Sequence, residues 1–114
     1  MNITEREKQK YRIIDVNGRI NRLSDSIKLK TIISRLLENN IFYIALNFAH
    51  VSYIDSGALN VLIYSYNYIM KKNGTLCIIG PNEYVRDVLE VVGLNRIVKI
   101  YSTEEDFEND KEDF

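Results

Sequence analysis

The segment Tyr53–Leu62, YIDSGALNVL, places a carboxylate, a hydroxyl and a glycine between two apolar runs. Ser56 could act as a nucleophile, cap a helix, or accept a group that another protein transfers. A hydroxyl at a helix N-terminus can accept a hydrogen bond from a backbone N–H two or three residues later. A phosphate on that hydroxyl would meet unpaired N–H groups and the positive end of the helix dipole, which tolerate an anion. The segment therefore permits a structural or a regulatory role for Ser56.

Three features beside this serine favour more than a cap. We expect the serine at the N-cap of a helix, yet Asp55 before it already supplies a side chain of the capping type. Gly57 after it allows another backbone to approach closely. Tyr53 and, one helical face away, Tyr64 and Tyr68 could bring large aromatic rings beside the turn. Capping by itself is therefore an incomplete explanation of the segment.

The sequence lacks residues that several kinds of enzyme site, and a phospho-aspartate receiver site, require. An esterase serine needs a base, and the only histidine, His50, lies six residues earlier in a predicted loop, without a nucleophile elbow. A phospho-aspartate receiver could use Asp55, but it needs an acidic pair where the chain has Asn17 and Gly18. The run GTLCIIGPNE lacks the Lys-Ser or Lys-Thr of a phosphate-binding loop. We therefore expect no catalytic residue, no cofactor and no metal, in a chain that is not an enzyme.

A chain of 114 residues has the size of one domain with a core of its own. Its one cysteine, Cys77, lies in an apolar run and cannot form an internal disulfide, so we expect a small buried hydrophobe in a reduced, cytoplasmic protein. The first ten residues are polar and charged, unlike a signal peptide, and nowhere do about 18 uncharged apolar residues follow one another. We expect no association with a membrane.

The charge is unevenly distributed although the net charge is −1. Residues 1–101 hold 14 Lys and Arg and 9 Asp and Glu, whereas residues 102–114 hold 7 acids and 1 Lys. The basic residues are scattered, without the interleaving of basic and aromatic residues that is typical of nucleic-acid sites. We expect no nucleic-acid partner, and solvated acids at the C-terminus with only residues 102–107 able to dock.

Hydrophobic periodicity predicts that strands and helices alternate along the chain. The predicted strands are an edge strand at residues 2–6, a strand at 10–18 that Asn17 and Gly18 end, and buried strands at 41–48, 75–80 and 96–101. The predicted helices run from a cap at Ser24 or Asp25 to Asn39 and Asn40, from Ser56 to residues 71–74, and across Val85, Val88, Leu89 and Val92 with Gly93 after the end.

Strands separated by helices require right-handed crossovers and a mostly parallel sheet. We therefore predict an α/β fold, a single domain over residues 1–114 with a mixed, mostly parallel sheet of four or five strands and helices packed on it. Its core spans about residues 10–101. Residues 102–114 form an acidic C-terminal helix and tail, which begins with a capping box of Ser102 and Glu105. Phe107 could dock this helix, and we expect the last few residues to fray.

The second predicted helix has an inward and an outward face. Its spacing turns inward Leu59, Leu62, Ile63, Tyr66 and Ile69. The same spacing turns outward Asn60, Tyr64, Asn67 and Lys71. An outward tyrosine near a helix start is a suitable anchor for a partner protein, because buried aromatic residues dominate interface energies. We expect Asn60 and Tyr64 to extend a binding surface.

The run YIDSGALNVLIYSYNYIMKKNGTLCIIGPNEYVRDVLEVVGLNRIVKIY, with GRINRLSDSIKLKTIISRLLENNIFYIALNFAHVS before it, resembles STAS domains of the anti-sigma factor antagonist type over about residues 10–101. Members of that family carry Asp-Ser, then Ser or Thr, then Gly, and their phosphorylated serine directly follows the aspartate. That position is Ser56, and the Gly-Leu pair at 93 and 94 also fits. Gly57 and Ala58 stand where the family usually has a second hydroxyl and a glycine, and Asn21 stands where antagonists often carry an aspartate.

The resemblance implies an anti-sigma factor antagonist that binds an anti-sigma factor, itself a serine kinase, and is switched off by phosphorylation of Ser56. A serine phosphatase would reverse the modification, and the free chain would be a cytoplasmic monomer. The alternative is a non-switching STAS scaffold, either a subunit of a stress-signalling assembly or the cytoplasmic accessory of a lipid transporter. The residues expected at the partner surface are Asp55, Ser56, Gly57, Asn60, Tyr64 and Asn21.

Overall fold

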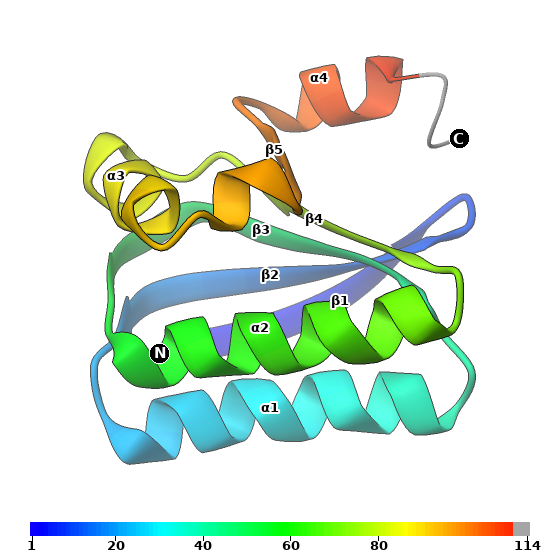
Figure 1. Ribbon diagram of the computed structural model, residues 1–114, viewed down its shortest axis with the longest axis horizontal. Helices are drawn as coiled ribbons and strands as arrows, with labels where there is room; N and C mark the ends of the chain where they lie inside the picture. The colour runs from blue at the N-terminus through cyan, green and yellow to red at the C-terminus, as the bar shows by residue number, and fades with distance from the viewer. Residues whose placement is uncertain (111–114) are drawn as a thin grey trace.

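The computed structural model describes residues 1–110, which form one α/β domain (Figure 1). The elements in chain order are β1 (Asn2–Lys8), β2 (Tyr11–Ile20), α1 (Leu23–Glu38), β3 (Tyr43–Ile54), α2 (Ser56–Lys71), β4 (Thr75–Ile79), α3 (Glu83–Val91), the 3-10 helix η1 (Leu94–Arg96), β5 (Lys99–Tyr101) and α4 (Glu104–Asn109). The strands form one sheet in the order β1-β2-β3-β4-β5, with β1 antiparallel to β2 and the other neighbours parallel. The predicted α/β fold with a mixed, mostly parallel sheet and an edge strand at the N-terminus is confirmed.

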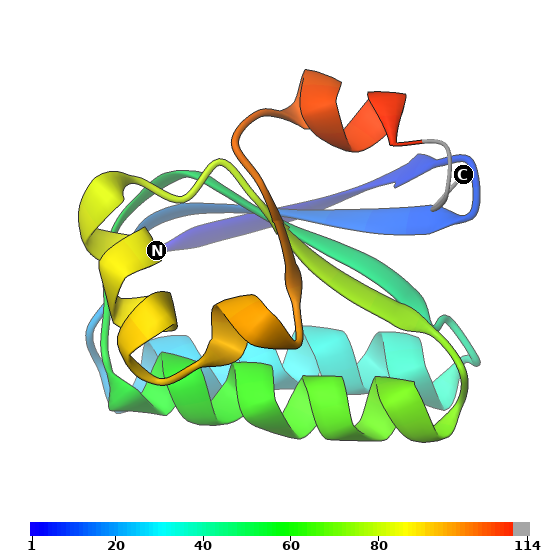
Figure 2. The same ribbon diagram turned by 45° about the horizontal axis from the view of Figure 1, so that its top comes forward.

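The helices cover the two faces of the sheet unequally. α1, α2 and α3 lie on one face, and α4 lies on the other (Figures 1 and 2). Because side chains alternate along a strand, Ile14 and Ile78 enter the large core under α1–α3, whereas Ile13 and Cys77 enter a smaller core on the α4 side. Phe107 of α4 belongs to that smaller core. Cys77 is fully buried, as expected.

β2 and β3 run further than the sequence analysis predicted. β2 continues through Asn17 and Gly18 because both residues pair with β3, and Asn17 also pairs with β1. The register shifts on both sides of this pair, and Gly18 has a φ of 108°, which a residue with a side chain rarely adopts. The expected strand end is wrong because neighbouring strands hold the backbone extended. β3 likewise reaches Ile54, so His50 lies in a strand and not in a loop.

The start of α1 also differs from the prediction. The helix begins at Leu23, with Arg22 at its N-cap. The Oδ2 atom of Asp25 accepts hydrogen bonds from the backbone N–H groups of Arg22 (3.1 Å) and Asn21 (3.3 Å). A cap at Ser24 or Asp25 is therefore wrong, because Asp25 stabilises the helix start from inside the first turn. The predicted end at Asn39 is confirmed.

Two predictions near the C-terminus need correction. β5 covers only Lys99–Tyr101, because the chain forms η1 after Gly93 before it rejoins the sheet. α4 begins after Thr103, whose hydroxyl accepts a hydrogen bond from the N–H of Asp106 at 3.0 Å. The predicted capping box of Ser102 and Glu105 is therefore wrong, because Thr103 takes the N-cap position.

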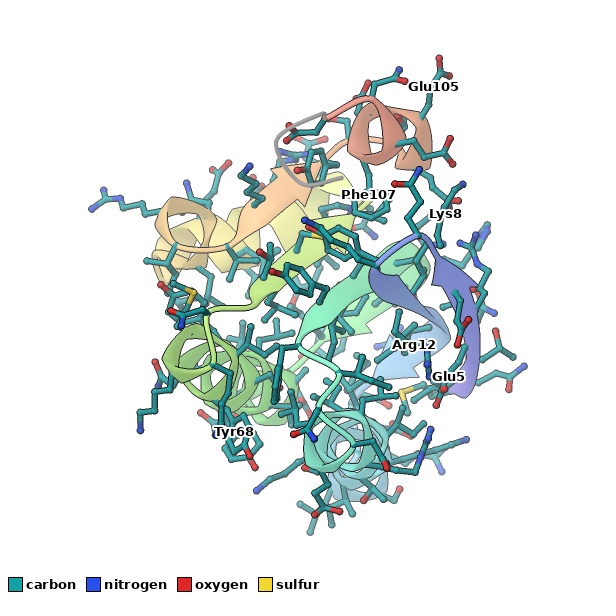
Figure 3. The ribbon with its side chains drawn as sticks, turned by 90° about the vertical axis from the view of Figure 1, so that its right-hand side faces the viewer. Glu5, Lys8, Arg12, Tyr68, Glu105 and Phe107 are labelled. Carbon is teal, nitrogen blue, oxygen red and sulfur yellow. The ribbon has the colours of Figure 1, made fainter. Side chains whose placement is uncertain are left out.

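Two of the four acids of α4, Glu104 and Glu108, make ion pairs with β1, which corrects the expectation that all of them are solvated. Glu104 accepts a hydrogen bond from Arg6 at 2.5 Å and lies 3.3 Å from the Lys8 ammonium. Glu108 also pairs with Lys8, whose side chain reaches towards α4 in Figure 3. Basic side chains near the end of the edge strand thus hold the acidic helix, and Phe107 docks as expected.

Residues 111–114 lie outside the described residues, so the prediction that the end of the chain frays falls on residues that the structure does not describe.

The two longest helices, α1 and α2, have 16 residues each, and both carry a polar face. Within residues 1–110, no helix combines the length and the apolar character that crossing a bilayer requires.

Candidate functional site

The residues around Ser56 lie where the parallel strands β2 and β3 end. The Asp55 N–H donates a hydrogen bond to the Ile20 carbonyl at 3.0 Å, which ties the start of α2 to the end of β2. α1 begins a few residues after β2, so the N-termini of α1 and α2 lie side by side (Figure 1). In open α/β sheets the carboxyl ends of the strands are the usual place for a binding site.

Asp55, and not Ser56, is the N-cap of α2, which corrects the first expectation about this turn. The Oδ1 atom of Asp55 accepts a hydrogen bond from the Ala58 N–H at 3.0 Å. Ser56 is the first residue of the helix and is exposed. Among the hydrogen bonds of residues 1–110, none uses the Ser56 hydroxyl. Because the aspartate does the capping, the Ser56 hydroxyl is not engaged at the helix start.

Gly57 lies against α1. A Cβ atom built on Gly57 would be 3.1 Å from Oγ and 3.3 Å from Cβ of Ser26. Ser26 is buried, and its hydroxyl donates a hydrogen bond to the Leu23 carbonyl at 3.0 Å. The Oδ1 atom of Asp55 would also lie 3.2 Å from that Cβ atom, so the close neighbours that the glycine permits are side chains and not another backbone.

Asn21 shares this edge with the turn at Asp55 and Ser56. It follows Ile20 directly, is exposed, and donates its N–H to Asp25 of α1 at 3.3 Å. The hydrogen bond between Ile20 and Asp55 brings these two segments together. The structure thus gathers Asn21, Asp55, Ser56 and Gly57 at one edge of the sheet.

The aromatic neighbours differ from the expected set. Tyr53 stacks on Tyr84 of α3, with ring centroids 5.5 Å apart and 11° between the ring planes, instead of meeting Tyr64. The guanidinium of Arg19 lies over the Tyr53 ring, 4.9 Å from its centroid. Desolvation beside Tyr53 raises the pKa of Tyr84 above its usual value. Sequence analysis missed Arg19 and Tyr84, because no local pattern shows that β2 and α3 meet β3 here.

The outer surface of α2 begins at Ser56 and carries the two predicted partner residues. Asn60 is exposed and Tyr64 is 39% exposed, with the Lys30 ammonium 4.7 Å from the Tyr64 ring centroid. Ile63 was expected inward but is 41% exposed. That expectation is wrong because the buried stripe of α2 is centred elsewhere; its members are Ala58, Val61, Leu62, Ser65 and Ile69.

Catalytic groups do not gather at this turn. His50 lies in β3, four residues before the strand ends, which corresponds to about 13 Å of extended chain. Ser56 therefore lacks the adjacent base that a nucleophilic serine requires. In the part of the chain that the structure describes, no cluster of three His, Cys, Asp or Glu residues could hold a metal ion. The edge supplies a hydroxyl and a shaped surface.

Comparison with known proteins agrees with this architecture. The family model of the STAS domain matches residues 2–107, so the chain belongs to the STAS domain family. A Thermotoga maritima protein with the name "Putative anti-sigma factor antagonist" is 31% identical over 99 residues, which span 82% of this chain and 88% of that protein. The name of this relative refers to the anti-sigma factor antagonist type of the family.

Solved structures show the same fold. A Thermotoga maritima protein with the same name has a crystal structure that superimposes on this chain with a TM-score of 0.85 at 29% identity. The match covers 93% of this chain and 92% of that one. The phosphorylated form of the Bacillus cell fate determinant SpoIIAA has a TM-score of 0.75 at 16% identity, over 94% of this chain and 97% of that one. At that identity the second similarity concerns the fold alone.

Proposed function

We propose that this chain is a cytoplasmic anti-sigma factor antagonist, monomeric when free, that Ser56 phosphorylation switches off. Its partner would be an anti-sigma factor that is also a serine kinase, and binding would release a sigma factor. The observation that carries the proposal is the exposed Ser56 hydroxyl at the start of α2, left free because Asp55 caps the helix. The similarity to a protein named as an antagonist supports it.

The chemistry at Ser56 would be phosphoryl transfer to this chain as the substrate. Its Oγ attacks the γ-phosphorus of ATP held by the kinase, the bond to the bridging oxygen breaks, and ADP leaves. The hydroxyl proton goes to a base on the kinase. A serine phosphatase restores the hydroxyl by hydrolysis. This chain supplies the acceptor and the surface around it, and the partner supplies the nucleotide.

The surface around the acceptor would bind the kinase. Asp55 and Gly57 shape the turn on either side of Ser56, and Asn21 lies on the adjoining segment. Asn60 and Tyr64 continue the surface along α2 and are exposed. These residues present polar groups and one aromatic anchor without a deep pocket, which suits a protein partner better than a small molecule.

Phosphorylation would release the partner without disturbing the fold. The phosphate adds about −1.5 to −2 charges beside Asp55. In the free domain it stays in solvent, and the N-terminus of α2 offsets part of the repulsion. In the complex the same dianion must be desolvated against a surface shaped for a hydroxyl. A loss of about 3 to 4 kcal/mol there weakens binding several-hundredfold.

The test uses Ser56 variants in the protein's own cell. Mass spectrometry of the tagged chain is expected to find phosphate on Ser56 and a co-purifying kinase, and the Ser56→Ala variant is expected to bind that kinase without becoming phosphorylated. Ser56→Asp is expected to keep its melting temperature and to bind several-hundredfold more weakly. If Ser56→Ala is labelled like wild type, or Ser56→Asp binds as tightly, the non-switching scaffold replaces this proposal.

A further inference from the structure

Two cations are held against tyrosines on either side of Ser56. The guanidinium of Arg19 lies over the ring of Tyr53, 4.9 Å from the ring centroid. Tyr53 precedes Ser56 by three residues in the sequence. Lys30 of α1 lies over Tyr64, about two helical turns along α2, at 4.7 Å. A cation that stacks on a ring keeps N–H groups directed outward while its side chain loses freedom. Both cations are therefore ordered before a partner arrives.

Arg19, Lys30 and the neighbouring Arg22 make no ion pair with the acids around them in the described residues. Basic residues on β1 and β2, such as Arg6 and Arg12, pair with carboxylates, whereas no ion pair in residues 1–110 involves Arg19, Arg22 or Lys30. We call these three residues the basic edge. The two acids in the adjoining helix starts, Asp25 and Asp55, accept hydrogen bonds from backbone N–H groups instead.

The N-termini of α1 and α2 add to the charge of the basic edge. Each helix start carries about half a positive charge, and the two starts lie side by side (Figure 1). Asp25 and Asp55 at these helix starts carry one full negative charge each and so outweigh the two half charges. With the three cations of the basic edge the surface still keeps a net charge of about +2. A surface of this kind attracts carboxylates and raises the rate of encounter with an acidic partner.

An apolar patch beside Arg22 distinguishes a protein partner from a nucleic acid. Leu23 is 76% exposed and Ile27, one turn further along α1, is 53% exposed. Protein interfaces are enriched in arginine and tyrosine around an apolar centre. The net charge of −1 also disfavours the non-specific phosphate binding of nucleic-acid proteins.

We propose that the basic edge, together with Tyr53 and Tyr64, is the docking surface for an acidic face of the protein that binds at Ser56. The surface follows from the geometry, and the identity of the partner as a kinase rests on the proposed function. In this arrangement phosphate on Ser56 neutralises part of the basic edge. The modification then weakens docking by charge as well as by desolvation.

The test compares two variants with the same change in charge. The basic-edge variant Arg19→Glu/Arg22→Glu reverses two of the three charges of the basic edge. The control variant Lys71→Glu/Lys72→Glu reverses two exposed cations at the far end of α2. Amide NMR spectra of each full chain are titrated with a capped hexaglutamate peptide at about 20 mM salt, where screening is weak. Wild type and the control are expected to show shifts at residues 19–22 and 53–57, and the basic-edge variant is expected to lose them.

The kinase recovered with wild type provides the second measurement. The basic-edge variant is expected to bind the kinase at least about tenfold more weakly than wild type, with a smaller salt dependence. The affinity of the control is expected to stay within about twofold of wild type. Equal binding of both variants, or peptide shifts centred on residues 71–72, would overturn the docking surface. If a single-stranded DNA of six nucleotides binds the same residues more tightly than the peptide does, the docking surface is one for nucleic acid. Absence of phosphate on Ser56, with the peptide result unchanged, would reject only the kinase.

Discussion

At the scale of single residues, the start of α2 separates helix capping, which Asp55 performs, from the exposed hydroxyl of Ser56. Asp55 caps α2 through its hydrogen bond to the Ala58 N–H, and Ser56 is left exposed with its hydroxyl free of that task. A serine at the N-cap would have its oxygen occupied by a backbone N–H. The preceding aspartate thus leaves the Ser56 hydroxyl unoccupied, which the proposed phosphorylation requires.

Gly57 is predicted to be a steric requirement of this chain. Gly57→Ser, which places a hydroxyl where the STAS family usually has one, brings its Cβ within 3.3 Å of Ser26. Ser26 cannot easily move, because it is buried between α1 and α2 and bonded to the Leu23 carbonyl. We expect Gly57→Ser to lower the free energy of unfolding by about 1 to 3 kcal/mol in urea denaturation.

A double-mutant cycle with Ser26→Ala identifies the cause. Removing the Ser26 hydroxyl takes away the atom nearest to the new Cβ, at 3.1 Å. The double variant is therefore expected to lose about 1 kcal/mol less than the two single losses together predict. Additive losses would mean that Gly57 is needed for another reason, such as the backbone of the helix start.

At the scale of elements, α4 closes the face of the sheet opposite α1–α3. Phe107 is fully buried and meets the rings of Tyr11 and Tyr101 edge to face, with centroids 4.9 and 5.6 Å away. The Tyr101 hydroxyl donates a hydrogen bond to Asp110 at 2.6 Å, just beyond the helix. The C-terminal helix is therefore part of the folded domain.

Phe107→Ala is predicted to be one of the costly substitutions in this chain. It removes a ring from the smaller core and exposes Tyr11 and Tyr101, so we expect a loss of about 3 to 5 kcal/mol in urea denaturation. Glu105→Ala on the same helix is the matched control, because Glu105 points away from the sheet in Figure 3 and is exposed. The control is expected to stay within about 0.5 kcal/mol. Equal effects of the two changes would show that α4 does not contribute to the core.

At the scale of the whole molecule, one arginine joins the two ends of the chain. Arg6 of β1 donates to Asp15 of β2 at 2.7 Å and to Glu104 of α4 at 2.5 Å. The hydrogen bond from Arg6 is the main cause that holds the pKa of each carboxyl below its usual value. The hydrogen bond from Asn47 to Asp15 acts in the same direction.

These lowered pKa values predict a loss of stability in acid. A carboxyl whose pKa is lower in the folded than in the unfolded chain stabilises the fold above the unfolded pKa of about 4, and this contribution disappears as the pH falls through the folded pKa. We expect the free energy of unfolding to fall from about pH 5 downward. Because these side chains are partly exposed and screened, the share of Asp15 and Glu104 is less than about 1 kcal/mol.

Urea denaturation across this pH range, at low and high salt, measures the effect. Asp15→Asn/Glu104→Gln is expected to flatten the acid limb of the stability curve, and Glu105→Gln is expected to leave its shape unchanged. High salt should reduce the difference between wild type and the double variant. An acid limb of the same slope in all three proteins would show that other carboxyls carry the pH dependence.

Much of the fold follows from local patterns in the sequence. The helical spacing of Leu29, Ile33 and Leu36 and the apolar run of β3 predict elements that the structure contains, because a face that must be buried imposes its period on the residues. The position of Ser56 at the start of a helix that follows a strand was predictable for the same reason. The parallel order of the strands follows from the helices between them.

Other features depend on contacts between distant segments, which no local period encodes. Asn17 and Gly18 resemble a turn in sequence but lie in β2, because β1 and β3 pair with the backbone there. Arg6 and Glu104 are 98 positions apart, and only the packing of α4 over the sheet pairs them.

The sequence determined the alternation of strands and helices and the place of Ser56 at a helix start, since both depend on neighbours within a few residues. The tertiary structure alone decided that Ser26 of α1 fills the space beside Gly57 and that Arg19 of β2 stacks on Tyr53 of β3. These contacts join elements that are far apart in the sequence, and no local pattern predicts that such elements lie close together in space. The basic edge beside Ser56 is therefore a property of the folded domain.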